Sequence, residues 1–181
     1  MKASMPFPTV RWKNQLVTFV AGSTRRESAK AALLFAFFSG RALLVDIEGR
    51  GWSIPGGHIR EGETPRRAVL REAREEAGIT LQRVTPLGSY RLESDEHAVS
   101  WVPVFVGEVA CFQAIPDDLE SRGCLLVEPH DLQYLYYMWD PLLEAVWSYA
   151  LETYAAAFPV AFSMSDMLET FQRTLPPPSA D

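Results

Sequence analysis

The sequence predicts a mixed α/β domain in which helices pack on a largely mixed sheet. Short segments rich in β-branched and aromatic residues precede, flank and follow a region that carries helix start and stop signals. A second amphipathic helix is expected after the last of these segments. The length of 181 residues suits a single domain with extensions, because domains typically contain roughly 100–200 residues.

The expected strands are apolar runs bounded by turn signals. A tight turn at 39–41 predicts that 30–38 and 41–48 form a hairpin. The run 98–110 is largely apolar, which favours a buried strand. The remaining expected strands are 15–21, 83–92 and one near 123–128.

Two helices are predicted from capping residues and apolar spacing. The first covers 65–77, with Thr64 as the N-cap, proline at the first helical position and Gly78 just past the end. The second covers 141–158, where an apolar stripe runs up to a proline. The rest of the C-terminal part is expected to hold a third helix and an unpacked tail, at 165–175 and 176–181.

Charge and composition argue against several classes of partner. Seventeen basic and twenty-three acidic residues give a net charge of −6, so no global positive field attracts a nucleic acid polymer. Cys111 and Cys124 do not match a disulfide framework or a zinc-ligand spacing. The longest apolar run, 31–38, is far shorter than the roughly 20 residues of a membrane-spanning helix, and no signal peptide is recognised. We therefore expect a cytoplasmic protein with no membrane partner.

Three glutamates of the first predicted helix share one side of it. At about 100° per residue, Glu72, Glu75 and Glu76 fall within one arc. Like charges at this spacing repel, so a compensating charge is expected. Mg²⁺ or Mn²⁺ suits a set of carboxylates without thiol or imidazole ligands. The alternative is a solvated acidic face offset by the basic face of the same helix, formed by Arg67, Arg71 and Arg74.

The approach to this helix is rich in glycine. The segment 52–57, Trp-Ser-Ile-Pro-Gly-Gly, ends a strand in a turn where two glycines allow close approach of the backbone to a ligand or to the helix. A glycine turn followed by metal-binding carboxylates suits a diphosphate, whose charge the metals would neutralise.

Between residues 57 and 79 the sequence resembles the signature of the Nudix hydrolases, G-x5-E-x7-R-E-U-x-E-E-x-G-U, where U is a bulky aliphatic residue. Ala73 departs from the pattern at the first U position. The matching residues are Gly57, Glu63, Arg71, Glu72, Glu75, Glu76, Gly78 and Ile79. The resemblance extends over about 28–135 of one domain spanning 1–181, which leaves an N-terminal extension (1–27), a C-terminal helical extension (136–175) and a tail (176–181).

The resemblance implies a Nudix α/β/α sandwich, a mixed sheet flanked by helices, here with an extra N-terminal strand and C-terminal helix. It implies hydrolysis of a nucleoside diphosphate linked to another moiety, by water attack at phosphorus. Arg71 would orient a glutamate of the motif, and Glu63 would contact that arginine or the metal shell. The metal ligands for Mg²⁺ or Mn²⁺ would be Gly57, Glu72, Glu75 and Glu76, and the further motif residues are Gly56, Glu63 and Gly78.

Several assignments stay open at this point. The general base is Glu72 or a glutamate outside the motif, for which Glu120 fits best, with a plain surface role as its alternative. Other outside carboxylates are Glu96, Glu108, Asp117 and Asp118. Side chains suited to gripping a phosphate, each with a solvated alternative, are Arg25, Arg26, Arg60 and Arg91. Aromatic residues suited to stacking a base, or to forming the core, are Trp12, Trp52, Tyr90, Trp101 and Phe112.

The substrate itself is not assigned by the sequence. A non-catalytic Nudix-fold regulator that senses a nucleotide is the alternative function. Isomerase chemistry on an isoprenoid diphosphate is a third, minor option, because it needs a reactive cysteine in the pocket. The terminal extensions also raise a homodimer as an open question.

Overall fold

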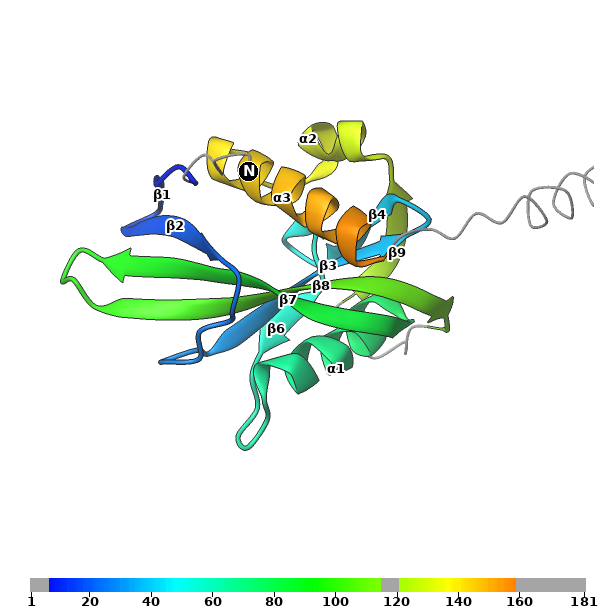
Figure 1. The fold of residues 1–181 in the computed structure, drawn as a ribbon, viewed down its shortest axis with the longest axis horizontal. Helices are drawn as coiled ribbons and strands as arrows, with labels where there is room; N and C mark the ends of the chain where they lie inside the picture. Colours follow the sequence, from blue (N-terminus) through cyan, green and yellow to red (C-terminus); the bar gives the residue numbers. More distant parts are fainter. Residues whose placement is uncertain (1–6, 115–120, 159–181) are drawn as a thin grey trace, which may run out of the picture.

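Within residues 7–114 and 121–158, which the computed structural model describes, nine strands form one sheet (Figure 1). Its main path runs β1-β2-β7-β8-β3-β4-β5, with β6 paired to β3 and β9 paired to β4. The strands are β1 (Val10–Trp12), β2 (Gln15–Ala21), β3 (Ala31–Phe38), β4 (Arg41–Ile47), β5 (Gly51–Ser53), β6 (Gly56–His58), β7 (Ile79–Ser94), β8 (Val99–Phe112) and β9 (Ser121–Val127). The helices are α1 (Pro65–Ala77), the short η1 (Pro129–Asp131), α2 (Leu132–Leu135) and α3 (Pro141–Ala157).

Strand β3 organises the sheet because it pairs with three other strands. On one side it runs parallel to β8, with Leu33 opposite Val104. On the other side its first residues pair with β6, and its last two residues pair with β4. The β6 pairing places Leu33 opposite Gly56 and thereby fixes the glycine turn against the sheet.

Helices α1 and α3 cover opposite faces of the sheet (Figure 1). On one face Ala68, Val69 and Ala73 of α1 join one buried apolar cluster with residues of β3 and β4. On the other face Val146 and Trp147 of α3 join a second cluster. The two clusters confirm the predicted α/β/α sandwich with a mixed sheet.

Helix α1 begins and ends where the capping signals predict. The Thr64 hydroxyl accepts a hydrogen bond from the backbone N–H of Arg67 at 3.3 Å. At the other end, Gly78 adopts the left-handed conformation with φ 60° and donates its N–H to the carbonyls of Ala73 and Arg74. These caps fix the length of the helix and therefore which carboxylates it presents.

We expect Gly78→Ala to lower the free energy of unfolding by about 1 kcal/mol, because a Cβ disfavours the left-handed conformation. Gly78→Asn should lower the free energy of unfolding by less, since asparagine tolerates the left-handed conformation better than alanine does. Urea unfolding of the three proteins measures the difference. An alanine variant as stable as the wild type would contradict the role given to this cap.

Three features of the fold were not predicted from the sequence. Strands β1 and β6 have three residues each, too few to show an alternating pattern. Strand β7 begins at Ile79 rather than at 83, because the buried Ile79 pairs with Phe112 directly after the helix cap. Helices η1 and α2 were also missed. The predicted helix at 165–175 and the tail at 176–181 lie outside the described residues.

None of the helices in the described ranges is both long enough and apolar enough to span a bilayer.

Candidate active site

Arg71 lies at the centre of a cluster of glutamates on α1 and the preceding loop. Its guanidinium binds Glu63 with two hydrogen bonds, from Nε to Oε1 and from Nη2 to Oε2, each 3.0 Å long. Its Nη1 donates to Glu72 at 2.7 Å and to Glu75 at 2.9 Å. Nη2 also donates to the backbone carbonyl of His58 at 2.9 Å. One arginine therefore connects three carboxylates to the strand β6 that precedes the loop.

The two glycines of the turn each approach one carboxylate. The backbone N–H of Gly56 donates to Glu76 Oε2 at 2.8 Å. A Cβ at Gly57 would overlap with the carboxylate of Glu72, so a larger residue there would displace this side chain. Gly56 is similarly restricted, because a Cβ there would lie 2.5 Å from the carbonyl oxygen of Ala32. The sequence predicted that the backbone of this turn comes close to a ligand or to the helix. In the structure it comes close to the carboxylates of the helix.

Arg60 closes the outer side of the cluster. Its guanidinium contacts both oxygens of Glu75, at 3.2 and 3.3 Å, and its backbone N–H donates to Glu63 at 3.0 Å. The sequence had suggested Arg60 as a phosphate-gripping residue, and it did not indicate the contact with Glu75. This contact depends on the path of the loop between β6 and α1, for which the sequence carries no local signal.

The cluster is only partly accessible to solvent. The side chains of Arg71, Glu63 and Glu72 are 16%, 13% and 13% exposed, whereas Glu75 is 31% exposed. The helical wheel had placed Arg71 on a separate basic face. Its long side chain reaches Glu75 one turn later and Glu63 in the loop, so Arg71 offsets the acidic charge of the helix, as one alternative from the sequence proposed.

The charges shift the pKa values inside the cluster. The hydrogen bonds from Arg71 and from the backbone of Arg60 lower the pKa of Glu63 below its ordinary value of 4.5. The hydrogen bonds to Glu63, Glu72 and Glu75 raise the pKa of Arg71, whose side chain therefore stays charged. The Glu63–Arg71 pair is thus a permanent ion pair at neutral pH.

We expect the Glu63–Arg71 pair to make stability depend on pH. Because the pKa of Glu63 is lower in the folded state, its contribution is complete above about pH 4.5 and is lost as the pH falls through the folded pKa. Urea unfolding between neutral pH and pH 3 should show that the free energy of unfolding falls more steeply with decreasing pH for the wild type than for Glu63→Gln. Parallel curves for the two proteins would rule out this contribution.

The donor set suits a hard divalent cation, because it consists of carboxylate oxygens beside a glycine backbone. Nη1 of Arg71 lies between Glu72 and Glu75, a position that a cation would also favour. Among the described residues, no three His, Cys, Asp or Glu side chains converge on one point. Arg71 holds Glu72 and Glu75 close to one another, and an ion between them would draw the carboxylates together further.

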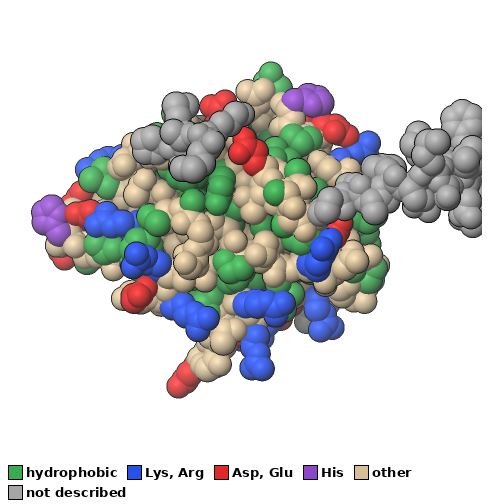
Figure 2. Space-filling view, viewed as in Figure 1, with side chains coloured by type: hydrophobic (Ala, Val, Ile, Leu, Met, Phe, Trp, Pro, Cys, Tyr) green, Lys and Arg blue, Asp and Glu red, His purple; other side chains and the backbone are tan. Residues whose placement is uncertain are grey.

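A hollow of about 440 Å³ opens beside the cluster, between α1 and the end of β8. Arg71, Arg74 and Glu75 line it on the helix side, and Gln113 and Ala114 line it on the strand side. Lys and Arg side chains gather over the lower part of the molecule, where α1 lies (Figures 1 and 2). An anionic group in this hollow would meet the carboxylate cluster and nearby cationic side chains together.

The other candidate residues lie away from the cluster or outside the described residues. Glu120 falls within 115–120, which the structure does not describe, as do Asp117 and Asp118. Glu108 pairs with Arg83 on the sheet, and the Arg25 guanidinium lies over the ring of Trp101. Neither arrangement brings these residues to Arg71.

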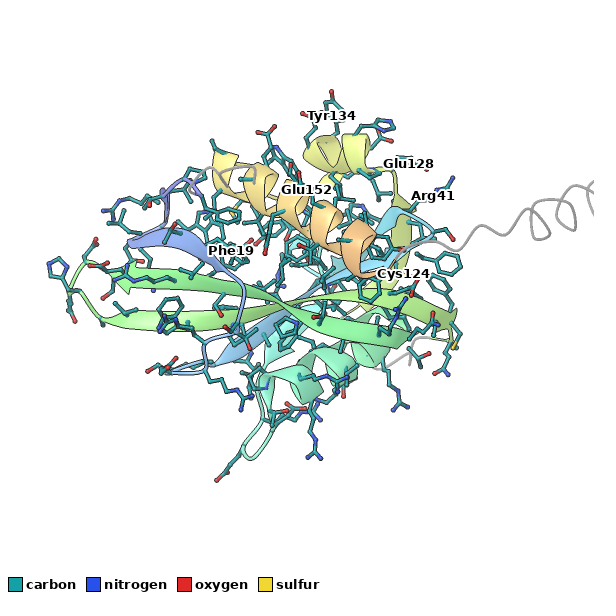
Figure 3. All side chains as sticks on the ribbon, viewed as in Figure 1. Phe19, Arg41, Cys124, Glu128, Tyr134 and Glu152 are labelled. Carbon is teal, nitrogen blue, oxygen red and sulfur yellow. The ribbon has the colours of Figure 1, made fainter. Side chains whose placement is uncertain are left out.

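The two cysteines lie at different places on the sheet. Cys111 is exposed and shares a hydrogen bond with Thr80. Cys124 lies on β9 (Figure 3), where burial raises the pKa of its thiol. A raised pKa disfavours the reactive thiolate, so Cys124 is not the activated cysteine that the isomerase option requires.

The chain is similar in sequence to proteins of one known family. The family model described as NUDIX domain matches residues 26–146, a range that begins slightly before the 28–135 predicted from the sequence and ends beyond it. A putative 8-oxo-dGTP diphosphatase YtkD of Bacillus subtilis is 28% identical over 100 residues, covering 55% of this chain and 63% of the relative. An RNA pyrophosphohydrolase of Psychromonas ingrahamii is 32% identical over 129 residues, covering 62% of this chain and 70% of the relative. The chain thus spans less than two thirds of the Bacillus relative.

A solved structure extends the likeness over most of the fold. The crystal structure of the Bacillus subtilis pyrophosphohydrolase BsRppH, as an E68A mutant, superposes with a TM-score of 0.68 and 21% identity. The superposition covers 81% of this chain and 97% of the other. At this identity, the likeness is one of fold.

Proposed function

The chain belongs to the NUDIX domain family, and on this premise we propose that it hydrolyses the diphosphate bond of a nucleotide-type small molecule with the help of Mg²⁺ or Mn²⁺. The observation that carries the proposal is the gathering of Glu63, Glu72 and Glu75 around Arg71, with Glu76 held at the glycine turn. A cluster of this kind is suited to holding cations beside an anionic substrate. The names of the relatives, diphosphatase and pyrophosphohydrolase, agree with this chemistry.

Nudix hydrolases generally use divalent metal ions. Bound ions would neutralise the charge of the diphosphate and lower the pKa of the attacking water. In this chain Glu72, Glu75 and Glu76, with the backbone carbonyl of Gly57, would hold them. The carboxylate oxygens are the hard ligands that Mg²⁺ and Mn²⁺ prefer.

The other residues of the cluster would position these ligands. Glu63 binds Arg71 through both of its oxygens, which fixes the plane of the guanidinium. Arg71 can then guide Glu72 and Glu75, since its Nη1 contacts both. The Gly56 N–H orients Glu76 in the same way.

For the general base we propose Glu72, which would accept the proton of the attacking water. Its carboxylate lies against Gly57 and is mostly shielded from solvent. Glu120, which lies outside the described residues, stays the second candidate because of its place in the sequence.

The function is tested by measuring product formation from nucleoside triphosphates, dinucleoside polyphosphates and sugar-linked nucleoside diphosphates, with Mg²⁺, with Mn²⁺ and with EDTA. We expect metal-dependent release of a mononucleotide and a second phosphate-bearing product, and loss of activity in EDTA. Tight binding of a nucleotide without turnover at any metal concentration would instead support the non-catalytic regulator. Locating ¹⁸O from labelled water in the products would identify the phosphorus that is attacked.

A further inference from the structure

Arg60 combines a fixed backbone with an exposed side chain at the edge of the carboxylate cluster. Its backbone N–H donates to Glu63 at 3.0 Å, which ties the residue to the ion pair of Glu63 and Arg71. Its side chain is 62% exposed, and Nη2 contacts the two oxygens of Glu75 at 3.2 and 3.3 Å. The guanidinium can therefore leave Glu75 while the backbone of the loop keeps its place.

The two arginines that contact Glu75 divide its oxygens between them. Nη1 of Arg71 donates to Oε2 of Glu75 at 2.9 Å. Within the part of the chain that the structure describes, Oε1 accepts a hydrogen bond from Arg60 alone. A metal ion close to Oε1 would repel the guanidinium beside it, because both are cations. Arg60 and a metal ion therefore compete for this oxygen.

Of the two arginines, Arg60 holds Glu75 the more weakly. Arg71 is only 16% exposed, contacts Glu75 and two other glutamates, and also binds the carbonyl of His58. The contact between Arg60 and Glu75 is longer and more exposed, and such ion pairs contribute little, because water screens them and a held side chain loses freedom. Arg60 is therefore displaced from Glu75 more easily than Arg71 when a divalent ion binds there.

A diphosphate bound beside Glu75 lies within reach of the displaced side chain. Mg²⁺ binds its oxygen ligands at about 2.1 Å, so a phosphate and a carboxylate that share one ion are direct neighbours. Arg60 already reaches both oxygens of Glu75, and a phosphate oxygen next to them requires only a change in its side chain. The guanidinium suits this partner, since its charge is permanent and its N–H donors match the spacing of phosphate oxygens.

We propose that Arg60 exchanges partners when the site is filled: it covers Oε1 of Glu75 in the free protein, and it binds a phosphate group of the substrate once a divalent ion occupies the carboxylates. The inference rests on the proposed function, because the substrate is the nucleotide-type diphosphate named there. In the free protein Arg60 offsets part of the negative charge of the cluster. After the exchange, the same charge stabilises the bound diphosphate.

The exchange predicts opposite effects on two ligands when Arg60 is replaced by alanine. Without nucleotide, Arg60→Ala should bind Mn²⁺ about threefold more tightly than the wild type, because the ion no longer competes with an exposed ion pair. In saturating Mg²⁺ it should bind methylenediphosphonate, a diphosphate analogue with a stable P–C–P bridge, about tenfold more weakly, because a charge-assisted contact is lost. Electron paramagnetic resonance of free Mn²⁺ and isothermal titration calorimetry measure the two affinities.

The matched control is Arg66→Ala. Arg66 is exposed in the first turn of α1, and its replacement removes the same charge close to Arg60 in the sequence. At physiological ionic strength, which screens exposed charges, both affinities should stay within a factor of about two of the wild type. Arg60→Lys keeps the charge without the guanidinium, so it should regain most of the wild-type Mn²⁺ affinity and only part of the methylenediphosphonate affinity.

The opposite directions separate an exchange of partners from a structural role. A loss of both affinities in Arg60→Ala would mean that the side chain only supports the loop, and would overturn the inference. Affinities equal to those of the wild type, or shifts equalled by Arg66→Ala, would overturn it as well. Urea unfolding of each variant, with a midpoint close to that of the wild type, verifies that the compared proteins are folded.

The two binding probes and the hydrolysis assay judge the two proposals separately. If nucleotides are hydrolysed but Arg60→Ala binds both probes as the wild type does, the exchange is wrong and the proposed function stands. If the two affinities shift in opposite directions but no nucleotide is hydrolysed at any metal concentration, the exchange stands and the proposed hydrolysis is wrong.

Discussion

Glu75→Gln and Glu76→Gln should each lower kcat by about 10²–10³, because each removes one preorganised charge from the group that would hold the metal ions. The amide of glutamine keeps the size of the side chain and can still accept a hydrogen bond. Glu75 contacts Arg60 and Arg71, and Glu76 accepts the N–H of Gly56, so glutamine leaves the packing of α1 unchanged. Steady-state rates with saturating nucleotide and Mg²⁺ provide the measurement.

The matched control for this pair is Glu61→Gln. Glu61 is exposed in the loop before α1, and its replacement changes the net charge by the same amount. Its rate should stay within a factor of about two of the wild type, as for surface positions away from a site. Full turnover by both Glu75→Gln and Glu76→Gln in excess metal would show that the reaction takes place elsewhere.

Arg71→Ala should be the most damaging substitution for both stability and activity. It leaves Glu63, Glu72 and Glu75 without their shared donor, and two of these carboxylates are only 13% exposed. Because the group is partly hydrated, we expect the free energy of unfolding to fall by about 2–3 kcal/mol, somewhat less than for a fully buried pair. We also expect kcat to fall by at least about 10², since the metal-holding carboxylates lose their orientation.

Arg71→Lys serves as the comparison, because lysine keeps the positive charge and lacks the planar guanidinium with its several N–H donors. A single ammonium cannot bind both oxygens of Glu63 and also reach Glu72, Glu75 and the carbonyl of His58. The lysine variant should therefore recover part of the stability and little of the activity. Urea unfolding and steady-state kinetics measure the two effects. An alanine variant within about 0.5 kcal/mol of the wild type would contradict the central place of Arg71.

The parts of the molecule that follow local rules were predicted correctly from the sequence. Helix α1 has the predicted bounds, because Thr64 and Gly78 act through contacts with residues three to five positions away. The hairpin of β3 and β4 was also predicted, since its turn lies within the run of residues that forms it. The proximity of the three glutamates on α1 follows from helix geometry alone.

The features that depend on distant contacts could not be predicted in this way. The contact of Glu76 with the Gly56 N–H requires β6 to pair with β3, and β6 is too short to be recognised. Arg71 looked like part of a separate basic face, because a helical wheel ignores the loop that brings Glu63 to it. Ser53 of β5 and Tyr90 of β7 line one small cavity on the α3 side of the sheet only because the fold brings these strands together, and neither residue shows this in the sequence.

The pairing of β3 with β8 has a consequence for how the protein folds. Leu33 must find Val104 across a long stretch of intervening chain, and such non-local parallel pairing is slow because loop closure costs entropy before contacts form. Helix α1 is built from neighbouring residues and can form early. Gly56 reaches Glu76 only after β3 is in place to receive β6. During refolding, helical structure should therefore return before the glycine turn closes on the carboxylates, and catalytic competence should be among the last properties regained.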